Sequence, residues 1–137
     1  KDFAVHQLGH ELSAMFDTAH GASLATVWGS WAKTVYQQNR PAFARFAENV
    51  MGVIAEADDT KAALSGIDKT VAFFRSIGMP ASLEENKDIG VQDDGILRDL
   101  AYRCTYTAPG RLEPSSFWEK KRFTRFIKQQ TTQKNSK

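Results

Sequence analysis

The amino-acid sequence predicts an all-α fold, a compact multi-helix domain. Apolar residues recur at spacings of three and four along most of the chain, as expected for helices with one buried face. No alternating apolar and polar pattern of useful length is present, as a half-buried strand would require. At 137 residues the chain is long enough for one domain with a proper core.

The first two helices are predicted on either side of a turn at Asp17 and Thr18. Residues 3–16 place apolar side chains at helical spacing, and Asp17 or Thr18 is suited to ending this helix and starting the next. A second helix is predicted over residues 21–38. Its predicted apolar side consists of Leu24, Val27, Trp28, Trp31 and Val35.

Two further helices are predicted in the middle of the chain. Pro41 suits the first turn of a third helix, because it lacks a backbone N–H and its φ is already helical. The predicted buried stripe of this helix is Phe43, Phe46, Ala47, Val50 and Ile54. Asp58 and Asp59 can cap a fourth helix, and Gly78 followed by Pro80 ends it. The predicted core residues of the fourth helix are Leu64, Ile67, Val71 and Phe74.

A turn-rich stretch with one short helical piece at residues 82–86 is predicted to precede a fifth helix. Asp93 or Asp94 can cap that helix, whose core-facing residues are Leu97, Leu100, Ala101 and Cys104. Cys104 is the only cysteine and cannot form an internal disulfide, which favours a reducing, cytoplasmic location. No apolar run approaches the ~20 residues that a membrane span needs.

All three histidines lie close together near the start of the chain. His6 and His10 are four residues apart and share one face of a helix, and the turn before His20 can bring the third imidazole back toward them. Histidine binds transition metals and titrates near neutral pH, so the cluster indicates metal binding or proton transfer. The alternative is ordinary surface histidines, because the cluster lacks the anionic ligand of most iron or zinc centres. Ala14 stands where the metalloprotease helix motif has its second histidine, which excludes that motif.

The residues around these histidines resemble the signature of the iron-dependent (group III) alcohol dehydrogenases, most closely the butanol-dehydrogenase-like branch. The resemblance covers residues 6–21, continues through Leu24, Ala25 and Trp31, and extends loosely over residues 45–47, 76–80 and 101–105. It implies that His6 and His20 are metal ligands. It also implies that His10 is a non-ligand beside the metal and the nicotinamide, where it relays a proton or orients a group.

The resemblance further implies a metal-dependent oxidoreductase that interconverts small primary alcohols and aldehydes, with Fe²⁺ or Zn²⁺ and NAD or NADP as cofactors. The family draws an aspartate and another histidine ligand from a preceding segment, and it binds the nucleotide with an N-terminal domain. No Gly-rich phosphate loop occurs in this sequence, so we expect a fragment that is inactive alone. Its expected partners are the small substrate and that N-terminal domain, with homodimer formation left open. Neither a membrane nor a nucleic acid is expected.

Three neighbouring features have two interpretations each. Trp28 and Trp31 can border a substrate pocket, but an aromatic stripe at helical spacing favours core packing. Gly21 either leaves room close to a metal or cofactor or serves a turn. Cys104 is predicted to be a small buried hydrophobe, with a minor pocket role left open.

The chain divides into a helical metal-binding domain, residues 1–106, and a basic C-terminal extension, residues 107–137, which departs from the family pattern. From Arg111 onward there are eight Lys or Arg against two Glu, whereas the first 110 residues carry ten basic against fourteen acidic side chains. A helix is predicted over residues 117–128, followed by a disordered end. Such a helix can bind a membrane surface or nucleic acid, but docking on its own domain is favoured. The competing functional hypothesis is a non-enzymatic helical module whose basic tail binds an acidic partner.

Overall fold

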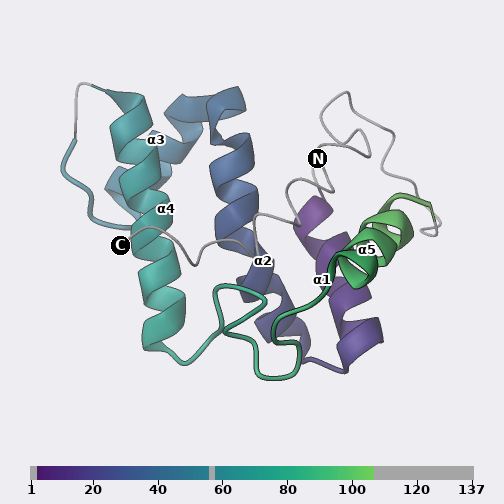
Figure 1. The fold of residues 1–137 in the computed structure, drawn as a ribbon. Coiled ribbons are helices and arrows are strands. Elements are labelled where there is room, and N and C mark those ends of the chain that lie inside the picture. The colour runs from purple at the N-terminus through teal and green to yellow at the C-terminus, as the bar shows by residue number, and fades with distance from the viewer. Residues whose placement is uncertain (1–2, 56–57, 107–137) are drawn as a thin grey trace.

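The structure, a computed structural model, describes residues 3–55 and 58–106. Every regular element in these two ranges is a helix, so the predicted all-α class is confirmed (Figure 1). The elements are α1 (Ala4–Phe16), α2 (His20–Val35), the 3-10 helix η1 (Tyr36–Asn39), α3 (Arg40–Asn49), α4 (Asp59–Ser76) and α5 (Asp94–Tyr106). Within these ranges no helix combines the length and apolar character needed to cross a membrane.

Helix α2 connects the two ends of the fold. It packs against α1 on one side and against α4 on the other, while α5 packs against α1 and α3 against α4. Figure 1 shows the α1 and α5 pair at one end and the α3 and α4 pair at the other. Two buried clusters match this division. One is centred on Leu8, Leu12, Leu97 and Leu100, and the other on Ala32, Tyr36, Ala63 and Ile67.

The predicted helix boundaries follow from local backbone chemistry. Asp17 adopts the left-handed conformation, with φ of 53°, and ends α1 as its C-cap. The side chain of Asp58 accepts a hydrogen bond from Thr60 N at 2.8 Å and caps α4. Asp93 Oδ1 accepts from Gly95 N and Ile96 N at 2.7 and 3.0 Å at the start of α5. These caps confirm the predicted starts of the last two helices.

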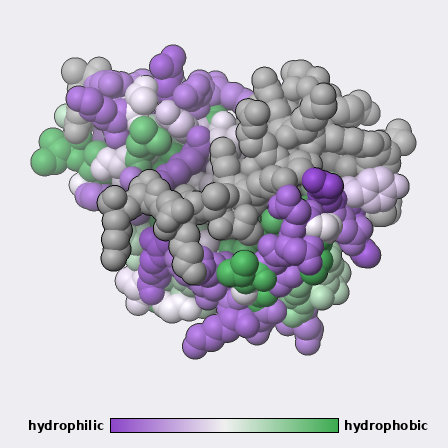
Figure 2. All heavy atoms as spheres, viewed as in Figure 1, coloured by the Kyte–Doolittle hydropathy of each residue, from purple (hydrophilic) through white to green (hydrophobic). Residues whose placement is uncertain are grey.

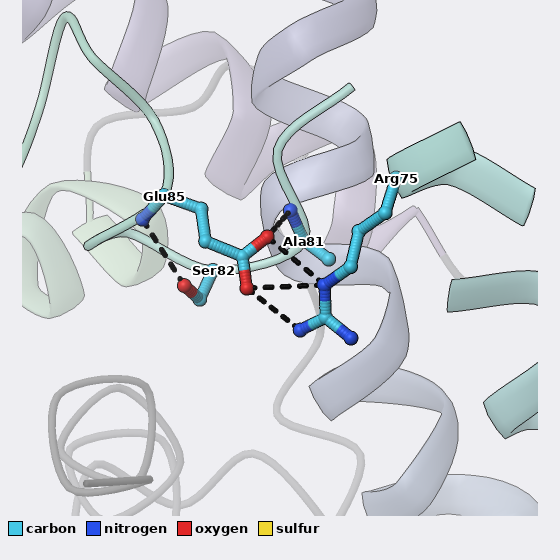
Figure 3. Close-up of polar contacts among 4 residues, drawn as sticks. All are labelled: Arg75, Ala81, Ser82 and Glu85. Atoms are coloured by element: carbon cyan, nitrogen blue, oxygen red, sulfur yellow. Dashed lines mark hydrogen bonds and ion pairs between the residues drawn. The ribbon is translucent and has the colours of Figure 1, made fainter. Parts of the chain in front are cut away.

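The end of α4 is fastened to the following loop by an ion pair. The Arg75 guanidinium donates from two nitrogens to the Glu85 carboxylate, the shortest contact being 2.6 Å (Figure 3). Glu85 also accepts from Ala81 N at 3.0 Å, and its own N–H donates to Ser82 Oγ at 3.2 Å. Gly78 adopts φ of 78° just after the helix, as the predicted stop required.

The predicted buried stripe of the third helix is wrong at its C-terminal end. Val50 and Ile54 were expected in the buried stripe of the third helix, but their exposed fractions are 66% and 86%. The physical reason is that α3 ends at Asn49, and Gly52, with a φ of 64°, then changes the direction of the chain. Val50 and Ile54 therefore do not continue the helical face. Residues 82–86 form a single helical turn, in which Asn86 N donates to the carbonyls of Ser82 and Leu83 at 3.2 Å each, and this turn does not continue into a helix.

The described surface is polar with scattered apolar residues. Where Figure 2 colours this face, the surface is largely hydrophilic and is interrupted by separate hydrophobic patches. The exposed large apolar side chains include Val50, Ile54, Phe73 and Ile77. The predicted basic extension, residues 107–137, and its helix lie outside the described residues.

Candidate functional site

The three histidines come together beside the contact between α1, which carries His6 and His10, and α2, which begins at His20. The ring centroids are 6.4 Å apart for His6 and His10, 5.8 Å for His6 and His20, and 5.3 Å for His10 and His20. All three side chains are exposed. The helical spacing and the intervening turn predicted that the three imidazoles would lie close together, and the structure shows this. The cluster faces solvent.

The position of the cluster follows from where α1 ends and α2 begins. His6 and His10 lie one turn apart on α1, and the chain reverses through Asp17. His20 is the first residue of α2, so its ring stands beside the N-terminal end of that helix. The helical spacing and the turn thus bring imidazoles from two successive helices together, with ring centroids 5.3–6.4 Å apart.

Gly9 allows the two helices to approach closely beside the histidines. A Cβ at this position would lie 2.8 Å from Leu24 Cδ2 and 3.0 Å from Ser23 Oγ. Ser23 Oγ in turn donates to the carbonyl of His20 at 2.8 Å, and Ser13 Oγ lies 3.4 Å from Ser23 Oγ. The role of Gly9 was missed in the sequence, although an isolated glycine inside an apolar helical pattern is a signal of close packing.

A buried polar network fastens the turn between α1 and α2. Asn86 is 2% exposed, and its Nδ2 donates to Thr18 Oγ1 at 3.1 Å and to Thr26 Oγ1 at 3.0 Å. Its Oδ1 accepts from Asp88 N at 3.1 Å. Because Thr18 and Thr26 bracket His20, this network holds the third histidine in place. No local pattern in the sequence pointed to Asn86.

An apolar groove of about 560 Å³ opens next to the cluster. Its lining includes His6 and Gly21 at the histidine end and Trp28, Phe74 and Met79 farther along. Trp28 and Phe74 meet edge to face, with ring centroids 5.7 Å apart. Volumes of this size are typical of small-molecule sites.

The two tryptophans lie between the core and the groove, and whether the groove is a substrate pocket stays a prediction. Trp28 and Trp31 are partly buried and pack against the cluster around Ile67, and both also line the groove. Gly21 lies within α2 without a positive φ, so a turn does not require glycine there. A Cβ at Gly21 would meet no atom within 4 Å, which fits the interpretation that this position leaves room.

Cys104 belongs to the core rather than to the site. It is 3% exposed among the leucines of α1 and α5. Burial, with a smaller effect from the negative charge of Glu11, raises the pKa of its thiol far above the ordinary value. The prediction of a small buried hydrophobe is confirmed.

The donor set of the cluster fits part of a metal shell. Imidazole nitrogens suit iron and zinc, but catalytic centres use at least three protein ligands. Across residues 3–55 and 58–106, no group of three His, Cys, Asp or Glu side chains is arranged to hold one ion. The assignment of His6 and His20 as ligands, with His10 as a neighbour, stays a prediction.

Comparison with known proteins decides the family. Residues 1–117 match the Fe-containing alcohol dehydrogenase family, in its C-terminal part. This chain belongs to that family. The all-helical fold described above is the C-terminal helical domain of these iron-containing alcohol dehydrogenases.

Individual relatives agree with this placement. The chain is 32% identical over 101 residues, 73% of its length, to a probable NADH-dependent butanol dehydrogenase 2 of Bacillus subtilis, of which it covers 26%. It is also 32% identical over 104 residues, again 73% of its length, to the NADPH-dependent aldehyde reductase YqhD of Escherichia coli, of which it covers 26%. Among iron-containing alcohol dehydrogenases it is therefore butanol-dehydrogenase-like.

A solved structure shows the same fold. An NADH-dependent butanol dehydrogenase A of Thermotoga maritima superposes with a TM-score of 0.78 and 26% identity, over 95% of this chain and 33% of that protein. The chain thus spans about a quarter of the length of its curated relatives and a third of this solved structure.

Proposed function

We propose that this chain contributes the histidine half of the active site of a metal-dependent, NAD(P)-linked alcohol dehydrogenase that interconverts small primary alcohols and aldehydes. The observation that carries the proposal is the convergence of all three imidazoles beside an apolar groove. The names of the relatives, NADH-dependent butanol dehydrogenases and an NADPH-dependent aldehyde reductase, support the substrate class and leave the nucleotide open. The proposed location is the cytoplasm, in keeping with a single buried cysteine.

His6 and His20 are the residues that would hold Fe²⁺ or Zn²⁺. When bound, such an ion polarises an alcohol or carbonyl oxygen and so favours hydride exchange with the nicotinamide. The two imidazoles come from different helices, so the ligand geometry depends on the packing of α1 against α2. Ser23, which donates to the His20 carbonyl, fixes the backbone on one side of this pair.

His10 has a separate role in the proposal. The centroid of its ring lies 5.3 Å from that of the His20 ring, so one water molecule can bridge the two imidazoles. The side chain of His10 is also exposed to solvent. Histidine exchanges protons near neutral pH, so His10 can accept the proton that leaves the alcohol oxygen and pass it to solvent.

The chain alone is expected to lack turnover. Two imidazoles fall short of a catalytic metal shell, and the proposal assigns the missing aspartate and histidine ligands and the nucleotide site to the partner N-terminal domain. Joining the 137 residues to the nucleotide-binding half of a family member should restore metal-dependent oxidation of primary alcohols. A fusion that folds and binds metal and nucleotide but shows no such oxidation would favour the alternative, a non-enzymatic helical module.

Metal titration of the isolated chain tests the ligand assignment directly. We expect replacement of both His6 and His20 by alanine to weaken Zn²⁺ binding at least tenfold, measured by calorimetry at pH 7.5. His10→Ala is the matched control and is expected to change the affinity less than about threefold, because a non-ligand contributes only indirectly. Binding that survives the double substitution unchanged would show that the metal is held elsewhere.

A further inference from the structure

The first turn of α2, which begins at His20, is held by side-chain hydroxyls and by one amide. Ser23 Oγ donates to the carbonyl of His20 at 2.8 Å, and Thr26 Oγ1 donates to that of Ala22 at 2.7 Å. Because a hydroxyl has one hydrogen, Thr26 can only accept any further hydrogen bond. Asn86 Nδ2 supplies the donor at 3.0 Å. The amide therefore completes a chain of hydrogen bonds that ends on the backbone of this turn.

Both hydrogens of the Asn86 amide nitrogen are used in this way. The second bond goes to Thr18 Oγ1 at 3.1 Å, two residues before His20. Thr18 is 4% exposed and Thr26 is fully buried, so the amide is the partner that satisfies these hydroxyls inside the protein. One side chain thus ties the chain on both sides of His20.

Asn86 is itself fixed by its own loop. Its N–H donates to the carbonyls of Ser82 and Leu83 at 3.2 Å each, and its carbonyl accepts from Ile89 N and Gly90 N at 3.0 and 2.9 Å. The peptide groups on both sides of the amide are therefore bonded. A side chain held in this way can impose an orientation on the turn that it binds.

We propose that Asn86 is a positioning residue for His20, and that its amide sets how tightly the histidine pair binds a divalent metal ion. This rests on the proposed function, in which His6 and His20 are the ligands. Their ring centroids are 5.8 Å apart and the rings stand on different helices, so their spacing depends on the orientation of the first turn of α2. A ligand already held in place loses less conformational freedom when the metal binds.

The first test is Zn²⁺ titration of the 137-residue chain by calorimetry at pH 7.5 and 10 °C, with circular dichroism to verify that each variant is folded. Asn86→Ala is expected to raise the dissociation constant about fivefold, because only the fraction of chains with His20 in place binds fully. Unchanged binding in this variant would overturn the proposal.

Gly66→Ala is the control for a general loss of stability. A Cβ at Gly66 would lie 2.9 Å from Ala47 Cα, so this variant weakens the contact between α3 and α4 instead of the histidine turn. It should leave the Zn²⁺ dissociation constant within about 1.5-fold. Equal losses in Gly66→Ala and Asn86→Ala would overturn the proposal.

Thr18→Val keeps the test decisive if Asn86→Ala is too unstable to titrate. It preserves the size of the side chain and removes one acceptor of the amide, so the dissociation constant should rise about twofold. Where both variants fold, the double variant should bind no more weakly than Asn86→Ala, because the two residues act through the same hydrogen bond. Unchanged binding in Thr18→Val, or additive losses in the double variant, would overturn the proposal.

The second measurement is amide hydrogen exchange without metal. Ser23 N donates to Ala19 O at 2.9 Å and Ala62 N donates to Asp58 O at 3.1 Å, so the two amides report on the first turns of α2 and α4. Asn86→Ala should accelerate exchange at Ser23 about fivefold more than at Ala62, because it loosens one turn locally. Equal acceleration at both amides would indicate a global effect and overturn the positioning role.

Failure of this proposal and failure of the proposed function give different results. If His20→Ala weakens Zn²⁺ binding and Asn86→Ala does not, the ligands stand and Asn86 does not position them. If His20→Ala leaves Zn²⁺ binding unchanged, the ligand assignment falls and the positioning role falls with it. In the His20→Ala background, Asn86→Ala should change the dissociation constant by less than about 1.5-fold, and a larger loss there would show that Asn86 acts elsewhere.

Discussion

The side chain of Asn86 is hydrogen-bonded at 3.1 Å to that of Thr18, which lies 68 residues earlier in the chain. The same amide reaches Thr26 at 3.0 Å, so a single buried side chain bridges both sides of the turn that carries His20. A buried amide of this kind favours one packing of the loop on the helices, because any displacement of the loop would leave buried polar atoms without hydrogen-bond partners. The candidate metal site thus depends on a residue of the loop before α5.

Removing this amide should destabilise the domain. Asn86→Ala leaves the hydroxyl of Thr18 without its amide partners, and we expect the free energy of unfolding to fall by about 2 kcal/mol. Lys87→Ala, an exposed neighbour, should change it by less than about 0.5 kcal/mol. Urea denaturation measures both, and equal effects of the two substitutions would show that the network does not stabilise the turn.

The contact between α3 and α4 should be intolerant of a methyl group. A Cβ at Gly66 would overlap the Ala47 side chain and lie 2.9 Å from Ala47 Cα, which belongs to the backbone and cannot rotate away. Gly66→Ala is expected to cost about 1–3 kcal/mol of stability in thermal unfolding. Gly21→Ala is the control at an open helical position and should be neutral or stabilising by up to about 1 kcal/mol. Tolerance of alanine at both positions would mean that the helices are not in close contact.

The ion pair at the end of α4 predicts a pH dependence. Hydrogen bonds from Arg75 and, less strongly, from Ala81 N lower the pKa of Glu85 below its usual value, despite an opposing effect of partial burial. A lowered pKa means that the stabilisation is fully present above the unfolded pKa of about 4.3 and is lost as the pH falls through the folded value. The stability difference between the native chain and Glu85→Gln should therefore shrink between about pH 5 and pH 3.

The size of that difference is limited by exposure. The two side chains are 51% and 37% exposed, so less than about 1 kcal/mol is expected at pH 7, and 0.5 M salt should reduce it. Urea titrations at pH 7 and pH 3 measure the effect. A difference that grows on acidification would contradict the assigned direction of the pKa change.

The thiol of Cys104 should react slowly in the folded protein. Burial raises its pKa and excludes reagents, so little thiolate is present near neutral pH and little of it is reachable. We expect iodoacetamide at pH 8 to modify the native chain at least tenfold more slowly than the chain in 6 M urea, as followed by mass spectrometry. Equal rates would indicate that α5 opens freely from α1.

The local structure was predictable because its causes are local. The left-handed cap at Asp17, the side-chain caps at Asp58 and Asp93, and the stop at Gly78 each involve a few adjacent residues. The convergence of the histidines followed from the same kind of information, a helical spacing and a turn. Val50 and Ile54 were misplaced because apolar character alone does not show where a helix ends.

The sequence alone determined the helical class, most helix boundaries and the three histidines that form the candidate site, since periodicity, capping and spacing are properties of neighbouring residues. Only the tertiary structure placed Asn86 against Thr18 and Thr26, joined α2 and α4 through Gly29 and Val71, and formed the groove beside His6. These contacts join residues tens of positions apart. Their partners are chosen by the packing of whole helices, which no local pattern in the chain describes.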